Sequence, residues 1–449
     1  MTASEIINKC RKSRCTAPHL LSLAFLLLAV FHAPQPAWAK KFVRVLPVDG
    51  TWWFVDSKNR TFISRGVDSV NINQDYIGHS KECPYESNAI ARYQTAESWQ
   101  KAAGDRLLLL NFNTLGAWSD SKVAVESTGK KKQLYYTVIL HAADSFDNWN
   151  HLGMCDFFDP KFAISTKALA EKICAPLKDD EKLIGYFGDN ELPWVSAGNP
   201  LLLQYLNFDA EAPGRRAAMA FLQRHYPSFI DFNRIWNTQC HSWTELDEAK
   251  NITAPAGNRE IKERFEKDCE DFASLAASRY FDIIDLSIKV ADPNHLNLGC
   301  RFSVYPGAPI LRACGSHVDV ISFNCYEPDP RKTIRKYASV GKPLLIGEFS
   351  FRSQDSGLPN SKGAGPIVQT QAIRGEWYES YVKNALSCPN IVGYHWFEHI
   401  DQPKEGRFDG ENSNYGIANI HDEPYAELTH VMKQINLEAE SLHDKAGDY

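Results

Sequence analysis

The sequence has 449 residues, of which 44% are hydrophobic and 23% charged, an ordinary balance for a globular protein with a sizeable core. This length allows two or three average domains, but a single α/β barrel can also reach it. The formal charge of −6 argues against a polyanionic partner such as nucleic acid. Aromatic residues make up 12% of the chain and offer flat faces for stacking on sugars as well as for core packing.

Residues 1–39 are typical of a cleaved export signal. Four basic residues between positions 9 and 14 precede an apolar run over 20–31, and Ala37-Trp38-Ala39 supplies a small-x-small cleavage site. The apolar run is shorter than the about 20 residues that span a bilayer, and no later stretch is typical of a membrane span. Without residues 1–39, the formal charge becomes −9 because four basic and one acidic residue are lost. We therefore expect a secreted or periplasmic protein.

The cysteines indicate few covalent constraints. Of the 11 cysteines, Cys10 and Cys15 fall in the expected signal and nine remain. Their spacing contains no CxxC pair, so we expect one to three disulfides, at least one free buried thiol and no metal. Neither a G-x-S-x-G elbow, a phosphate-binding loop nor a dinucleotide fingerprint is present, and we expect no cofactor.

From residue 52 onward, short apolar runs alternate with longer stretches of helical periodicity, a pattern typical of βα units around a parallel sheet. Eight strands are expected, over 62–70, 112–118, 135–140, 183–191, 295–303, 318–326, 343–350 and 390–398. Helices are expected at 95–106, 165–177, 261–291, 368–386 and 424–442. The α/β sequence thus predicts a (β/α)8 TIM barrel over residues 40–449, a single catalytic domain with an insertion at 192–260 after strand four.

The stretch "GYFGDNELPW" (185–194) places ionisable groups directly after the fourth expected strand. Taken alone, Asp189, Asn190 and Glu191 are typical of a solvated turn. However, barrel chemistry lies at the carboxyl ends of the strands, and Glu348 ends the seventh expected strand in the same way. We therefore expect Glu191 and Glu348 to face each other across the opening of the barrel at the carboxyl ends of its strands.

Two facing carboxyl groups suit the hydrolysis of glycosidic bonds. One carboxylic acid protonates the leaving oxygen, and one carboxylate attacks the sugar or activates water. If strands four and seven face each other, Glu191 and Glu348 stand about 5 Å apart, which is the spacing of a retaining enzyme, whereas a wider gap would mean inversion. Apolar walls from Phe187 and Trp194 and the charge of Glu348 would raise the pKa of Glu191, as a proton donor requires.

Several motifs resemble the retaining (β/α)8 clan of glycoside hydrolases, and most closely family 50, the β-agarases. They are "GYFGDNELPW", "FNRIWNT", "ISFNCY", "LLIGEFSF" and "HWFEHIDQPKEGRFDGENSNYG". The resemblance covers roughly residues 50–430 and implies cleavage of a neutral β-linked galactan, most simply agarose. Family 42, the β-galactosidases, is a more distant resemblance and the alternative within this clan.

The resemblance also implies roles for individual residues. Glu191 would be the general acid/base and Glu348 the nucleophile, while Asn190 would bind the 2-hydroxyl group of the sugar. Tyr326 would hydrogen-bond Glu348, and Trp396 would form the floor of the same subsite. The last motif would supply a substrate-facing loop that contains Arg407, Asp409, Glu411 and Asn412.

Two other interpretations of these motifs are less consistent with the sequence. "HWFEH" (395–399) matches the H-x-x-E-H pattern of zinc proteases, but that pattern needs a helix, and here it continues an expected strand. A non-catalytic carbohydrate-binding protein on a hydrolase barrel is expected to lack one of the two carboxylates, and both Glu191 and Glu348 are present.

Export can be tested directly. If residues 1–39 are a signal, the mature protein begins at Lys40, because signal peptidase cuts after the small-x-small site. N-terminal sequencing of protein recovered from the medium or periplasm measures this. Secreted protein that still begins at Met1 would contradict the prediction.

Overall fold

The computed structural model describes residues 41–446, except 79, 127–133, 147–152 and 196–198. The expected export signal lies outside these residues. Within the described part of the chain, no helix is both long and apolar enough to cross a membrane.

The centre of the structure is a curled sheet of eight parallel strands in the order β8-β7-β6-β5-β4-β13-β10-β9. Each of the eight expected ranges contains one of these strands, so their prediction is confirmed. A parallel bridge between Phe302, which follows β8, and Phe323 of β9 connects the two ends of this order. The strands are β4 (Ser64–Val67), β5 (Thr114–Leu115), β6 (Tyr135–Ile139), β7 (Leu183–Phe187), β8 (Leu296–Asn297), β9 (Ile321–Asn324), β10 (Leu344–Phe349) and β13 (Ile391–Trp396).

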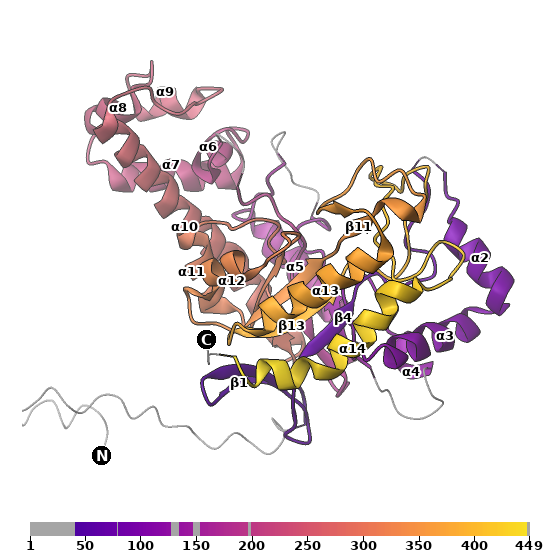
Figure 1. Cartoon of the computed structure of the whole chain (residues 1–449). Coiled ribbons are helices and arrows are strands. Elements are labelled where there is room, and N and C mark those ends of the chain that lie inside the picture. Colours follow the sequence, from indigo (N-terminus) through magenta and orange to yellow (C-terminus); the bar gives the residue numbers. More distant parts are fainter. Residues whose placement is uncertain (1–40, 79, 127–133, 147–152, 196–198, 447–449) are drawn as a thin grey trace, which may run out of the picture. The chain divides into compact units, whose positions relative to one another are not determined.

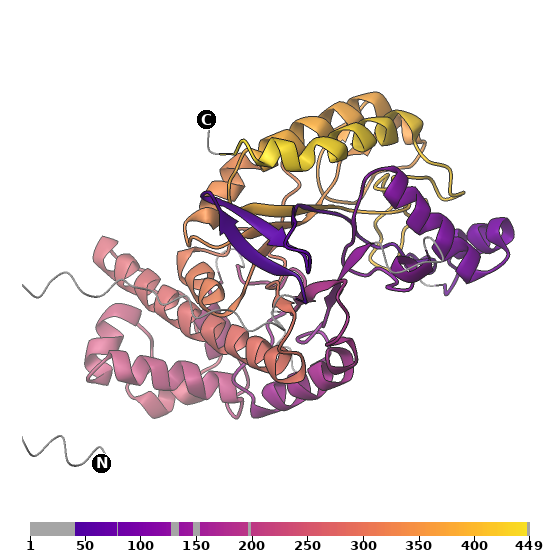
Figure 2. The same cartoon turned by 90° about the horizontal axis from the view of Figure 1, so that it is seen from below.

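Helices surround the outer side of this sheet (Figure 2). The five expected helical segments correspond to α3 (Ala96–Leu109), α5 (Pro160–Ile173), α10 (Arg259–Ala291), α13 (Gln371–Leu386) and α14 (Ala426–His443). Further helices are α2 (Pro84–Tyr93), α4 (Val123–Glu126), α6 (Leu201–Leu206), α7 (Pro213–His225), α8 (Phe229–Trp236), α9 (Trp243–Glu248), α11 (Ala308–His317) and α12 (Arg331–Ala338). Four of these, α6 to α9, lie between β7 and β8 and pack near α10 (Figure 1).

Several helices begin at polar residues that cap their free backbone N–H groups. The side chain of Thr95 accepts a hydrogen bond from the backbone of Ser98 at 3.1 Å. Asn258 does the same for Ile261 at the start of α10, also at 3.1 Å. Pro160 and Pro213 occupy first-turn positions, where a missing N–H is not needed.

The sheet separates two apolar cores because successive strand residues point to opposite faces. In β10, Leu344 and Ile346 pack in the large core against the helices, whereas Leu345 joins a smaller core on the inner face. The smaller core also contains Phe54 from β2 (Thr51–Val55), which forms a hairpin with β1 (Arg44–Val48).

The β1–β2 hairpin lies at the amino-terminal end of the sheet (Figure 2). Phe54 stacks on Phe62 at a centroid distance of 5.7 Å, and Phe62 belongs to β3 (Thr61–Phe62), directly before β4. Because the hairpin covers the amino-terminal end, a site can form only at the opposite end, among the loops at the carboxyl ends of the strands.

All nine cysteines after residue 39 are free thiols. The expectation of one to three disulfides is therefore wrong, whereas the expectation of a free buried thiol is confirmed. The physical reason is burial in separate places: Cys155, Cys174, Cys300 and Cys314 each pack as small apolar residues in the large core.

An ion pair fixes α3 to the chain before α14. Both terminal nitrogens of Arg106 donate to the carboxylate of Asp422 at 2.7 Å, and Tyr85 donates to the same group at 2.8 Å. These hydrogen bonds outweigh burial and lower the pKa of Asp422 to about 2. The carboxylate is therefore stabilised in its ionised form.

The Asp422→Asn variant should lose about 3 kcal/mol of unfolding free energy at neutral pH, because Arg106 keeps a buried charge without its partner. The ionised carboxylate contributes fully above its ordinary pKa of 3.8, and this contribution is lost as the pH falls through about 2. Denaturant unfolding at several pH values measures both effects. Asp105→Asn, which breaks an exposed ion pair with Lys101 on the same helix, is the matched control and should change little. An equal loss in both variants would contradict this account.

Candidate active site

Strained backbone marks the carboxyl ends of five neighbouring strands. Ser69, Trp118, His141, Glu191 and Arg301 follow β4, β5, β6, β7 and β8, and their φ angles are 55°, 59°, 57°, 54° and 49°. Residues other than glycine rarely adopt positive φ, and such strain gathers at functional sites. The strained residues therefore lie at the carboxyl ends of the strands, where the sequence predicts the site.

Arg301 lies at the centre of this edge and is completely buried. Its Nη2 donates to Glu348 Oε1 at 2.7 Å and to Asp68 Oδ2 at 3.0 Å, and its Nε donates to Asn190 Oδ1 at 2.9 Å. The guanidinium carbon also lies 4.7 Å from the ring centroid of Trp118. One cation thus connects groups from the ends of four other strands.

Glu191 and Glu348 join the same hydrogen-bond network. Asn324 Nδ2 donates to Glu191 Oε1 at 2.8 Å and also lies 3.4 Å from Asn190 Oδ1. Tyr326 Oη donates to Glu348 Oε2 at 2.7 Å, so both Glu348 oxygens accept a hydrogen bond. The structure therefore brings together Asn190, Glu191, Tyr326 and Glu348, as the sequence predicts.

The two carboxyl groups have different surroundings. Glu191 is exposed to solvent as a residue, while its Oε1 accepts the hydrogen bond from Asn324. Burial, followed by the negative charge of Glu348, raises the pKa of Glu191 to about 7. Glu348 is 5% exposed, and its two oxygens accept hydrogen bonds from a guanidinium and a phenol. The raised pKa of Glu191 suits a group that holds a proton near neutral pH.

Asp189 shows why this stretch is not a solvated turn. It is completely buried, and its two oxygens accept hydrogen bonds from the backbone of Ala143 at 2.8 Å and from Tyr280 Oη at 2.7 Å. The backbone N–H of Glu191 donates to the carbonyl of Arg301 at 3.1 Å. Asp189 therefore anchors the turn, while Asn190 and Glu191 face the network.

The expected substrate-facing loop is held by polar contacts. Arg407 is only 9% exposed and forms ion pairs with several carboxylates, including those of Asp409 and Glu411 at 2.9 Å. Asn412 Oδ1 accepts from the backbone of Ser361 at 3.0 Å. Glu411 is near enough to help raise the pKa of Glu191. The loop is thus close to the carboxylates, but Arg407 points into the protein.

Trp396 lies in a different position from the one that a sugar-binding floor requires. Its side chain is completely buried in the large core and donates to the carbonyl of Tyr415 at 2.9 Å. Alternation along β13 turns it toward α13, where it packs on Tyr378. The half-buried Trp118 lies beside Arg301 instead.

Sequence reasoning missed Arg301, Asn324 and Asp68. The rule that found Glu191 and Glu348 also applies to Arg301, since this charged residue follows the buried strand "HLNLGC". Asn324 lies inside the quoted motif "ISFNCY", and Asp68 lies in the first expected strand. A search of every strand end for polar side chains would have found all three.

The histidines of "HWFEH" have separate environments. β13 runs to Trp396, which confirms the expected strand. His395 Nε2 lies 2.9 Å from Ser64 Oγ, whereas His399 Nε2 lies 3.4 Å from Arg106. Burial lowers the pKa of both imidazoles to about 3. Within the described residues, no group of three or more His, Cys, Asp or Glu side chains is placed to hold a metal ion.

Comparison with known proteins finds similarity to agarases. β-Agarase B of Vibrio sp. strain JT0107 is 28% identical over 90% of this chain and 49% of its own length. The structure of an exo-β-agarase matches 90% of this chain and 66% of its own at 21% identity, with a TM-score of 0.78. The agarase AgWH50C matches 90% of this chain and 65% of its own at 25% identity, with a TM-score of 0.77.

The similarity covers most of this chain but only part of each relative. The chain spans about half the length of the curated relatives it matches. No protein-family model matches the chain. The solved agarases establish a shared fold for the described part of the chain.

The interaction between the carboxyl groups can be measured. In Glu348→Gln, the pKa of Glu191 should fall below about 7, because a neutral amide no longer opposes its ionisation. It should stay above the ordinary value of 4.5, since burial, the larger cause, remains. Carbon-13 NMR titration of glutamate carboxyl groups gives both values. Glu327→Gln, an exposed glutamate after β9, is the control, and an unchanged pKa in Glu348→Gln would show that the two groups do not interact.

Proposed function

We propose that this protein is a retaining glycoside hydrolase that cleaves a neutral β-linked galactan, most simply agarose. The observation that carries the proposal is the pairing of Glu191, whose pKa is raised to about 7, with Glu348, held by Arg301 and Tyr326. Similarity to β-agarases over most of the chain supports the galactan.

In the first step, Glu191 donates its proton to the glycosidic oxygen as the bond from that oxygen to the anomeric carbon breaks. Glu348 attacks the anomeric carbon and forms a glycosyl ester. Its two hydrogen bonds, from Arg301 and Tyr326, hold the carboxyl group in position before this attack. A separation of about 5 Å between the two carboxyl groups is part of this proposal.

In the second step, a water molecule attacks the anomeric carbon and the ester bond to Glu348 breaks. Glu191, now a carboxylate, takes the proton from this water. Once Glu348 is an uncharged ester, the like charge that helps to raise the pKa of Glu191 is gone. The same side chain therefore suits the acid role first and the base role second.

The proposed setting of this chemistry is a closed (β/α)8 barrel with an insertion after its fourth strand. The bridge between Phe302 and Phe323 supports closure, and α6 to α9 between β7 and β8 support the insertion. Export by residues 1–39 would place the enzyme outside the cytoplasm, where a polymeric galactan can reach it.

Stereochemistry provides the decisive test. Hydrolysis of agarose or its oligosaccharides should release the β-anomer first, because two inversions at the anomeric carbon give net retention. Proton NMR in the first minutes, before mutarotation, measures the anomer. An initial α-anomer would contradict the role of Glu348.

Two matched variants separate the roles. Glu348→Gln should lose turnover on every substrate, because the amide keeps the shape but is not a nucleophile. Glu191→Gln should lose about 10²–10⁴-fold on the oligosaccharide, but less on nitrophenyl β-galactoside, whose leaving group needs little protonation. Equal losses of Glu191→Gln on both substrates would contradict its acid role. Cleavage of the nitrophenyl substrate alone by the parent protein would favour a β-galactosidase.

A further inference from the structure

The loop that carries Arg407 is held in place by the ion pairs of this buried side chain. Arg407 Nη1 lies 3.4 Å from Asp75 and 3.9 Å from Glu398, and its Nη2 lies 2.9 Å from both Asp409 and Glu411. All four partners and the nearly complete burial of Arg407 leave this guanidinium no free face for a ligand. Arg407 therefore shapes the loop.

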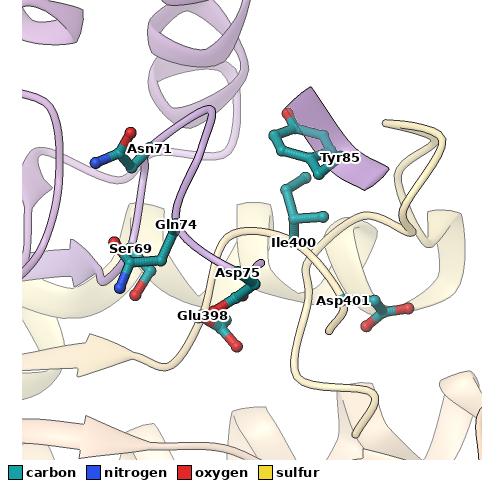
Figure 3. A pocket seen from close by; sticks show the side chains of 8 residues that line it. All are labelled: Ser69, Asn71, Gln74, Asp75, Tyr85, Glu398, Ile400 and Asp401. Atoms are coloured by element: carbon teal, nitrogen blue, oxygen red, sulfur yellow. The ribbon is translucent and has the colours of Figure 1, made fainter. Parts of the chain in front are cut away.

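The space next to this cluster is too small for a sugar. Asp75 and Glu398 lie side by side at a cavity of about 10 Å³, which is also lined by Ser69 and Tyr85 (Figure 3). Such a volume accommodates about one water molecule. A ligand at this loop must therefore lie on its outer surface.

That outer surface carries a pair of exposed aromatic rings. Tyr76 is 42% exposed and Phe408 is 48% exposed, and their ring centroids are 5.5 Å apart at an interplanar angle of 32°. An antiparallel bridge between Ile77 and Arg407 joins the two loops that carry them. Because the loops are bonded to each other, the two rings have a fixed relative position.

The exposed pair is continuous with the candidate active site. Trp118 covers Arg301 and makes an edge contact with Phe397 at 6.3 Å. The guanidinium of Arg407 lies 5.5 Å from the centroid of Phe397 and 5.1 Å from that of Phe408. A series of ring and guanidinium contacts thus leads from the group that holds Glu348 to the outer rings.

We propose that Tyr76 and Phe408 form a distal subsite that stacks on a sugar ring of the same galactan chain whose cleaved bond lies at Glu191 and Glu348. This inference rests on the proposed function. Exposed aromatic rings beside a binding site are groups that can contact the apolar face of a ring-shaped ligand.

The charge around the pair selects a neutral sugar. Asp409 and Glu411 follow Phe408 closely, and Asp75 precedes Tyr76. These three carboxyl groups outnumber the two cations at the loop, Arg407 and Lys362, whose Nζ donates to the carbonyl of Asp409, so a sulfate ester at this position would meet repulsion. The subsite should accordingly favour unsulfated over sulfated galactan.

Binding by the Glu191→Gln protein, in which cleavage of the oligosaccharide is strongly slowed, tests the proposal. Calorimetric titration with agarose oligosaccharides of increasing length should show a gain in affinity at the length that reaches the distal subsite. Phe408→Ala and Tyr76→Ala, each added to this protein, should weaken the affinity for the longer oligosaccharides about tenfold. The affinity for the shortest oligosaccharide should not change. Phe408→Trp should keep the gain, since it retains a ring, whereas Phe408→Leu should lose it.

Ile230→Ala is the matched control, because Ile230 is 81% exposed on α8, away from these loops (Figure 1). Thermal melting checks that each variant is folded. Unchanged affinity in both alanine variants, or equal losses for short and long ligands, would overturn the distal subsite but not the proposed function. Tight binding of a sulfated carrageenan oligosaccharide at the pair would overturn the preference for a neutral sugar. If the Glu191→Gln protein binds no agarose oligosaccharide at all, the proposed function fails and the subsite with it.

Discussion

The burial of one positive charge is the constraint on which the site depends. Arg301 is completely shielded from solvent, and a buried cation is tolerated only when anions and hydrogen-bond acceptors surround it. Arg301 Nη2 contacts the carboxyl groups of Asp68 and Glu348, and its Nε donates to Asn190; burial raises the pKa of Asp68 to about 7. Space is equally restricted: a Cβ at position 347 would lie 2.8 Å from Asn324 Oδ1 and 3.2 Å from Arg301 Nη1, so glycine is needed directly before Glu348. The residue that carries the proposed chemistry thus also neutralises the cation beneath it.

The two ends of the sheet differ: apolar side chains pack at one end, and residues with positive φ lie at the other. At the amino-terminal end, the β1–β2 hairpin adds Phe54 to the inner core. At the carboxyl end, five consecutive strands finish in residues with positive φ, a conformation that costs on the order of 1–3 kcal/mol each. The apolar packing at one end stabilises a sheet that tolerates strain at the other. Of the strained residues, Trp118, Glu191 and Arg301 belong to one network.

The loops above that network combine rigid and exposed parts. Asp401 accepts from Asn414 at 2.7 Å and from the backbone of Gly416 at 2.9 Å, and Arg374 donates to the carbonyl of Gly416 at 2.9 Å. Together with the ion pairs of Arg407, these bonds fix a long irregular segment without regular secondary structure. The fixed loop holds Phe408 48% exposed, with its ring against Tyr76 and the guanidinium of Arg407.

The sequence by itself determined the alternation of strands and helices, since apolar periodicity is a local property, and it located Glu191 and Glu348 because each directly follows a buried strand. It did not identify Arg301 as their link, because the bonds to Asp68 and Glu348 join residues 233 and 47 positions apart. Only the tertiary structure decided which way side chains face: Trp396 points into the helix layer, and Arg407 points inward while its neighbour Phe408 points out. These directions depend on strand register and on ion pairs between distant loops, which no local pattern records.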